Sequence, residues 1–111
     1  MRVDRLTGKI PLDLESKIGY KNNMNYRVTM KRKVLQAIGK MPRAEQKKLA
    51  LLVDDLSDHG PAQPGWPNYS KLSDEKYHCH LSPKWVACWR HEKKTIEIEV
   101  YYAGSRENAP Y

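Results

Sequence analysis

Apolar and polar residues alternate with a period of two along the C-terminal third of the chain, which is typical of strands with one buried face. Three such segments follow one another, at 77–81, 85–91 and 95–103. The links between them, 82–84 and 92–94, are short enough for antiparallel hairpins. The pattern therefore predicts a run of three antiparallel strands.

A helical period precedes these strands. Apolar residues recur at the spacing of one helix face in two runs: Val34, Leu35, Ile38 and Met41, then Leu49, Leu52, Val53 and Leu56. Pro42 separates the runs and suits the first turn of the second helix, which predicts a helical hairpin. A short strand is predicted at 25–30 from its strand propensity, and a loop at 57–68, where three prolines and two glycines fall within a dozen residues.

The order strand, helix, helix and three strands predicts an α+β fold, in which two helices pack on one face of a mostly antiparallel sheet and leave the other face free. The alternation assigns these residues to the helix side: Tyr77, Cys79, Leu81, Trp85, Ala87, Trp89, Ile96, Ile98 and Val100. It assigns these to the free face: His78, His80, Lys84, Val86, Cys88, Arg90, Glu97, Glu99 and Tyr101. The free face therefore collects the titratable side chains and is the candidate site.

The chain of 111 residues fits one domain. Residues 1–23 have no sustained period and are interpreted as an N-terminal arm, with the domain at 24–111. We find neither an apolar run long enough to span a membrane nor a signal peptide, so a cytoplasmic protein is expected. Two cysteines exclude a disulfide framework.

Positive charge is in excess, with 20 Lys and Arg against 13 Asp and Glu and a net charge of +7. This excess favours a polyanionic partner such as an RNA backbone, although a basic helix face is often only solvated. The candidate RNA-binding residues are Lys31, Arg32, Lys33, Lys71, Lys84 and Arg90. Trp66 and Tyr69, in or beside the predicted loop, are expected to pin that loop to the domain rather than to stack on a base.

Two local motifs resemble a known family. Tyr77-His78-Cys79-His80-Leu81 stands where RelE-like toxins carry Tyr-Lys-x-Lys-Leu, and the segment 96–100 runs into Gly104-Ser105-Arg106-Glu107 and a late Tyr111, as in the last strand of those toxins. From about residue 25 to residue 111, the chain is thus similar to the RelE-like toxin superfamily, whose members include the RelE and HigB ribosome-dependent mRNA interferases of type II toxin-antitoxin systems.

The resemblance implies an endoribonuclease that cleaves mRNA on the ribosome without metal or other cofactor, inhibits translation and has a cognate antitoxin protein as partner. Its catalytic residues would be His78, His80, Arg106 and Tyr111. Many members carry an arginine where this chain has Val86, so a phosphate contact at that position must come from elsewhere.

The two histidines suit this chemistry. Side chains at i and i+2 of a strand project from one face about 6–7 Å apart, which lets His78 and His80 flank one phosphate. Imidazole has an ordinary pKa near 6.5, so one ring can act as base and the other as acid. Arg106 would hold the phosphate, the simpler alternative being a surface pair with Glu107.

Other interpretations of these residues are weaker. A zinc site at 78–80 is disfavoured because Cys79 points to the opposite face and no second ligand pair exists. A cysteine nucleophile is disfavoured because no Cys-His-Asn pattern exists. Two further functions stay open, namely a non-catalytic RNA- or ribosome-binding module of the same fold and a structural partner of an acidic protein.

Overall fold

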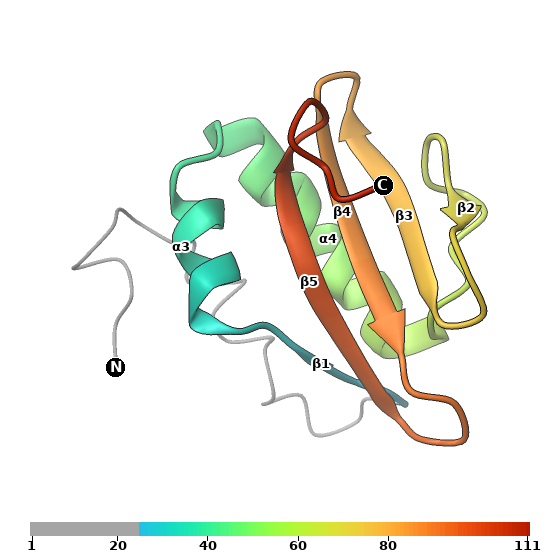
Figure 1. Ribbon diagram of the computed structural model, residues 1–111. Coiled ribbons are helices and arrows are strands. Elements are labelled where there is room, and N and C mark those ends of the chain that lie inside the picture. Colours follow the sequence, from blue (N-terminus) through green and yellow to red (C-terminus); the bar gives the residue numbers. More distant parts are fainter. Residues whose placement is uncertain (1–24) are drawn as a thin grey trace.

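The computed structural model describes residues 25–111, and the arm expected at 1–23 lies outside the described residues (Figure 1). Its elements in chain order are β1 Arg27–Thr29, α3 Arg32–Gly39, α4 Arg43–His59, β2 Ser70–Lys71, β3 Lys76–Ser82, β4 Trp85–His91 and β5 Glu97–Ser105. The predicted α+β class, with two helices against one face of a mostly antiparallel sheet, is confirmed.

The sheet has the strand order β1-β5-β4-β3-β2. The meander β3-β4-β5 is antiparallel as predicted, and β1 joins β5 in parallel. The two-residue strand β2 pairs antiparallel with β3, placing Ser70 opposite His78 and Lys71 opposite Tyr77. Sequence periodicity did not reveal β2, because two residues are too short to display a period.

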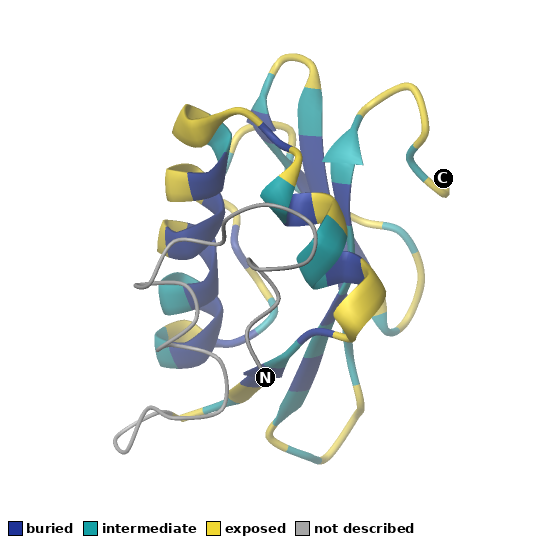
Figure 2. Ribbon diagram, turned by 90° about the vertical axis from the view of Figure 1, so that its left-hand side faces the viewer, coloured by how far each residue is buried: buried dark blue, intermediate teal, exposed yellow. Residues whose placement is uncertain are grey.

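Both helices lie on one side of the sheet, and the buried side of α4 faces it (Figure 2). The helix continues to His59, so the loop predicted from Ser57 begins three residues too early. Ser57 is buried rather than solvated, and its hydroxyl donates to the carbonyl of Tyr26 over 3.3 Å. Gly60 ends the helix with φ of 94° while its N–H donates to the Leu56 carbonyl.

The loop after α4 is fastened to the domain by side chains, as expected for Trp66 and Tyr69. The indole Nε1 of Trp66 donates to Asp55 Oδ2 over 2.8 Å. The ring of Tyr69 stacks against those of Tyr77 and Trp89, with centroids 6.3 and 6.2 Å away. The loop is therefore held in place, and it positions β2 at the edge of the sheet.

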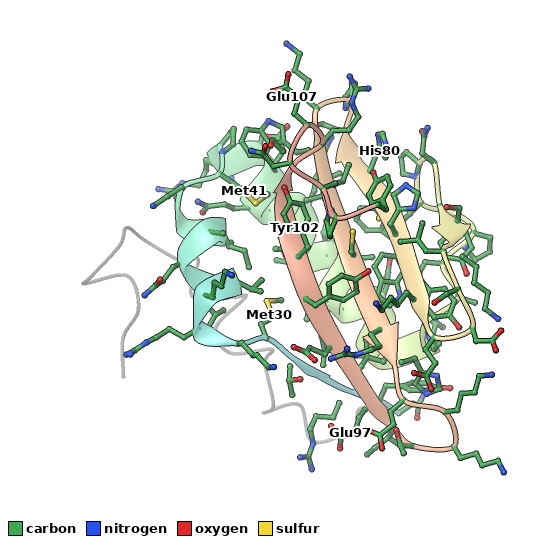
Figure 3. The ribbon with its side chains drawn as sticks, viewed as in Figure 1. Met30, Met41, His80, Glu97, Tyr102 and Glu107 are labelled. Carbon is green, nitrogen blue, oxygen red and sulfur yellow. The ribbon has the colours of Figure 1, made fainter. Side chains whose placement is uncertain are left out.

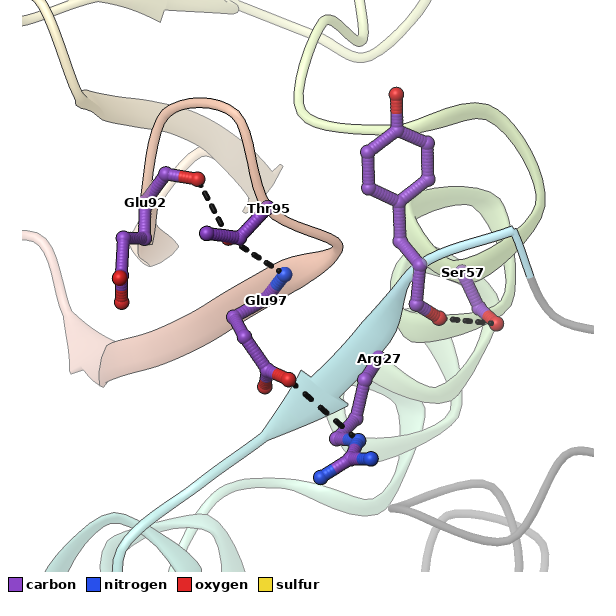
Figure 4. A network of polar contacts seen from close by, with 6 residues as sticks. Arg27, Ser57, Glu92, Thr95 and Glu97 are labelled. Carbon is purple, nitrogen blue, oxygen red and sulfur yellow. Dashed lines mark hydrogen bonds and ion pairs between the residues drawn. The ribbon is translucent and has the colours of Figure 1, made fainter.

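The predicted helix-side residues pack against the helices, with one exception. Ile96 is 51% exposed, because it precedes β5 and belongs to the β4–β5 turn. The Thr95 hydroxyl closes this turn by donating to the Glu92 carbonyl over 2.6 Å (Figure 4). Figure 4 also shows the ion pair that joins Arg27 of β1 to Glu97, the first residue of β5.

The other sheet face is not free, which corrects the prediction. A bulge shifts the register so that Trp89 pairs with Val100 but Cys88 pairs with Tyr102. Val100 and Ala103 consequently both join the core, although their odd spacing would place them on opposite faces of a regular strand. The tyrosines between them lie on the far face, where Tyr102 is visible in Figure 3.

The C-terminal segment adds to this cover. It crosses in front of β4 in Figure 1. Val86 and Cys88, expected on a free face, are consequently 0% exposed. The far face of the sheet is therefore a second, smaller layer of packing rather than an open platform.

Gly60 should tolerate no side chain. A Cβ at this position would lie 2.8 Å from the Tyr26 ring, and φ is positive. We expect Gly60→Ala to lower the free energy of unfolding by about 1–3 kcal/mol in denaturant titrations. Gly65→Ala is the matched control, since a Cβ there meets nothing within 4 Å, and it should change stability by less than about 0.5 kcal/mol. Equal stability of the two variants would contradict this account.

Candidate functional site

Strand β3 brings the two histidines to one face, as predicted. The rings of His78 and His80 are 5.8 Å apart between centroids and inclined at 60°. Cys79 between them points into the core on the helix side and is 0% exposed. The alternation of a single strand therefore separates the two imidazoles from the thiol.

His78 is held among neighbours on three sides. His78 is only 8% exposed, and the hydroxyl oxygen of Ser70 lies 2.9 Å from the Nδ1 atom of its ring. The ring of Tyr111 lies against it, with centroids 4.3 Å apart. Burial, and then the neighbouring His80, lower the pKa of His78 below 6.5, while a hydrogen bond to the Ser70 backbone opposes this shift. His78 is therefore a neutral imidazole at pH 7.

His80 is more open and lines a pocket of about 360 Å³ together with Arg106. Figure 3 shows His80 near the end of β3, where the β3–β4 turn begins. The other lining residues come from α4, the long loop and the β3–β4 turn: Lys48, Pro67, Asn68, Leu81, Ser82 and Pro83. The pocket thus combines an imidazole, a guanidinium and an ammonium group from separate segments.

Arg106 is positioned by its backbone. Its N–H donates to the Lys84 carbonyl over 2.8 Å, which ties the end of β5 to the β3–β4 turn. Arg106 and Lys84 also line a neighbouring pocket of about 270 Å³ with Trp85, Ser105 and Glu107. Among the ion pairs of the described residues, none joins Arg106 to Glu107, so its guanidinium is available to an anion.

Tyr111 stands over this face with about half of its surface exposed. Burial and the nearby Cys88 raise the pKa of Tyr111, and the positive charge of Arg106 opposes that shift. The phenol is therefore protonated near neutral pH and able to donate a hydrogen bond. Its place beside His78 brings together the four residues expected to act as one site.

The residues expected to bind RNA do not gather in one place. Lys84 borders the pockets beside Arg106. Arg90 instead pairs with Glu99, which also lies 3.9 Å from Lys31. These three residues and Lys33 line a groove of about 500 Å³ between α3 and the far face of the sheet.

Two further cations expected to bind RNA lie outside the pockets beside Arg106 and outside the groove beside α3. Lys71 lies on the helix side, with its Nζ 5.8 Å from the ring of Tyr77. Arg32 is exposed on α3. The far-face pocket and groove therefore account for only part of the predicted RNA-binding set.

The two cysteines are buried free thiols. Burial raises the pKa of Cys79 and of Cys88 to about 12. Cys88 pairs with His78 in the sheet, but a thiol with this pKa stays protonated at neutral pH and is a poor nucleophile. Within residues 25–111, no group of three or more His, Cys, Asp or Glu side chains is arranged to hold a metal ion, and no helix is long and apolar enough to cross a membrane.

Two residues that sequence reasoning missed belong to this site. Ser70 lies on β2, and Asn68 lies in the long loop with φ of 55°. Lys48 on α4 also lines the pocket, and the sequence placed it only among several basic residues of the two helices that could contact an RNA backbone. Asn68 and Ser70 depend on how the loop folds back, which no local period encodes.

No protein-family model matches the chain, and no curated protein matches it significantly. Among solved structures, the chain is similar to a chain of the archaeal RelE–RelB complex from Pyrococcus horikoshii. The two share 18% of their residues with a TM-score of 0.63, and the match covers 78% of this chain and 100% of the other. The RelE-like fold expected from the motifs is thus confirmed.

The thiols should be inert in the folded protein. At pH 8, we expect a thiol-specific reagent such as Ellman's reagent to react slowly with native protein, because both thiols are buried with pKa values of about 12. After unfolding in guanidinium, both cysteines should react at once. Rapid modification of one thiol in the native protein would show that Cys88 is accessible and would restore it as a candidate nucleophile.

Proposed function

We propose that this chain is the toxin of a type II toxin-antitoxin system, a cytoplasmic endoribonuclease that cleaves mRNA on the ribosome and thereby inhibits translation. The RelE-like fold supports the class. The net charge of +7 supports an RNA substrate and a ribosomal RNA surface. The proposed class includes the RelE- and HigB-type mRNA interferases.

One observation carries the proposal: His80 and Arg106 line one pocket, and the ring of His78 is 5.8 Å from that of His80. A phosphate held by Arg106 in this pocket would lie beside His80, whose ring is next to that of His78. Lys48 and Lys84 add positive charge around it. These cations would take the place of the arginine that many RelE-like toxins carry at the position of Val86, because the buried Val86 offers no contact to a phosphate.

The chemistry needs only side chains. One imidazole takes the proton of the 2′-hydroxyl, whose oxygen attacks the phosphorus, and the other imidazole protonates the departing 5′-oxygen. The products are a 2′,3′-cyclic phosphate and a free 5′-hydroxyl. Arg106 stabilises the negative charge that grows on the phosphate oxygens, and Tyr111 assists by hydrogen bonding or by stacking. No metal or other cofactor takes part in this scheme.

Removing these groups should slow cleavage strongly and leave the fold intact. We expect His78→Ala, His80→Ala and Arg106→Ala each to slow single-turnover cleavage on programmed ribosomes by about 10²–10⁴-fold, because each removes a proton carrier or a phosphate contact. In cells, the same variants should lose growth inhibition.

Two matched controls accompany these variants. His59→Ala removes an exposed histidine at the end of α4, and Arg27→Ala removes an exposed arginine on β1, so both should keep wild-type rates. Near-wild-type cleavage by both histidine variants would remove the imidazoles from the mechanism. Absence of cleavage by the wild-type chain itself, together with ribosome binding, would favour the non-catalytic RNA-binding module.

We further propose a cognate antitoxin as partner. The solved structure with the similar fold is itself a RelE–RelB complex. A partner that covers Lys84, Arg90 and Arg106 must supply carboxylates to Lys84 and Arg106, since burying these two cations unpaired would cost several kcal/mol, whereas Arg90 already pairs with Glu99. We expect the chain to purify from its native cells with an acidic protein that high salt weakens. A neutral or basic partner that leaves this face open would count against the assignment.

A further inference from the structure

Strand β2 contributes a single functional contact to the site. Its two residues pair with β3 so that Ser70 stands opposite His78, and the Ser70 hydroxyl lies 2.9 Å from His78 Nδ1. A strand this short adds little to the stability of a sheet. The contact is nevertheless firmly supported, because the preceding loop is fixed by several bonds.

These bonds come from separate elements. The Trp89 indole donates to the Pro61 carbonyl over 3.0 Å, and the Trp66 indole to Asp55 over 2.8 Å. The backbone N–H of His80 donates to the Pro67 carbonyl over 2.8 Å, only three residues before Ser70. The hydroxyl of Ser70 is therefore presented to His78 by a rigid segment, although the residue itself is solvent-exposed.

The contact decides which ring nitrogen can react. With Nδ1 engaged by Ser70, Nε2 is the nitrogen of His78 left for a substrate. For the neutral ring to accept a proton at Nε2, its own proton must lie on Nδ1, where the hydroxyl oxygen of Ser70 can accept it. A proton on Nδ1 leaves the lone pair of the neutral ring on Nε2.

We propose that Ser70 is a positioning residue that holds His78 with its proton on Nδ1 and its lone pair on Nε2. Resting on the proposed function, this assigns the two proton-transfer roles: His78 is the base that accepts the 2′-hydroxyl proton, and His80, in the pocket with Arg106, is the acid. The proton then passes from the 2′-oxygen to Nε2 of His78, and a proton on the His80 ring passes to the 5′-oxygen.

The other groups that face His78 leave this assignment intact. Cys88 on β4 and Tyr111 of the C-terminal segment are neutral at pH 7, because burial raises the pKa of each. Lys76, two residues earlier on β3, lies with its Nζ 5.7 Å from the ring of Tyr101. The neighbouring imidazole is that of His80, whose ring centroid lies 5.8 Å from that of His78.

The test is a direct measurement of the tautomer. Long-range ¹H–¹⁵N correlation spectra of ¹⁵N-histidine-labelled full chain at pH 7.5 distinguish protonated from free ring nitrogens, and His78→Gln identifies the signals of His78. We expect Nδ1 of His78 to be protonated in the wild type. Ser70→Ala should shift the ring towards the Nε2-protonated form, whereas Ser70→Thr, which keeps the hydroxyl, should restore the wild-type spectrum.

Ser73→Ala is the matched control, because Ser73 is an exposed serine in the β2–β3 turn, and the hydroxyl bonded to the His78 ring is that of Ser70. Its spectrum should equal that of the wild type. Cleavage by Ser70→Ala should fall about 10- to 100-fold through kcat, with KM little changed, since the base is misoriented rather than the RNA released. The acidic limb of its pH–rate profile should also move, which a purely structural role would not produce.

Two results would overturn the inference. A wild-type His78 protonated on Nε2, or a tautomer unaffected by Ser70→Ala, would refute the positioning role whatever the cleavage assays give. If the tautomer behaves as expected but His78→Ala cleaves normally, the assignment of His78 as base is wrong. If wild-type chain binds ribosomes without cleaving, the proposed function fails, and the spectra still report on the contact between Ser70 and His78 independently.

Discussion

The position of Trp89 is the constraint on which the site depends. The ring lies fully buried in β4, stacks on Tyr77 of the neighbouring strand at 6.0 Å and donates its indole N–H to the Pro61 carbonyl. One side chain thus joins the sheet to the long loop after α4. Because a buried indole N–H without an acceptor is costly, the loop is held at this carbonyl and cannot drift. Tyr69 then extends the same aromatic stack to the end of the loop.

The position of Trp89 affects the proposed site because Tyr69, whose ring stacks on that of Trp89, is followed directly in the chain by Ser70. The hydroxyl of Ser70 meets His78 on the opposite face of the sheet. The core on the helix side therefore determines the geometry of an imidazole on the far side. A substitution that loosened the aromatic stack would disturb the site without touching any residue in it.

Periodicity predicted the elements well because their burial patterns are regular. The bounds of β4 agree with the prediction, and the common face of His78 and His80 follows from simple alternation. The bulge at Tyr101 could not be predicted, because it depends on how β5 pairs with β4 rather than on either sequence alone. The prediction of a free face was wrong partly for the same reason, because the bulge adds a tyrosine to the face that holds Val86 and Cys88, both of which are buried.

The burial of His78 gives a physical reason for finding histidine where the similar family carries lysine. A lysine at a position only 8% exposed would have to bury an ammonium group or lose its proton, and either is costly without a carboxylate partner. Imidazole becomes neutral there at little cost, since burial already lowers the pKa of His78. Neutral imidazole is the form that accepts a proton, so the cover provided by Ser70, Cys88 and Tyr111 suits the proposed role of His78 as base. In the proposed mechanism, the more open His80, which shares its pocket with Arg106, is the donor to the departing oxygen of a bound phosphate.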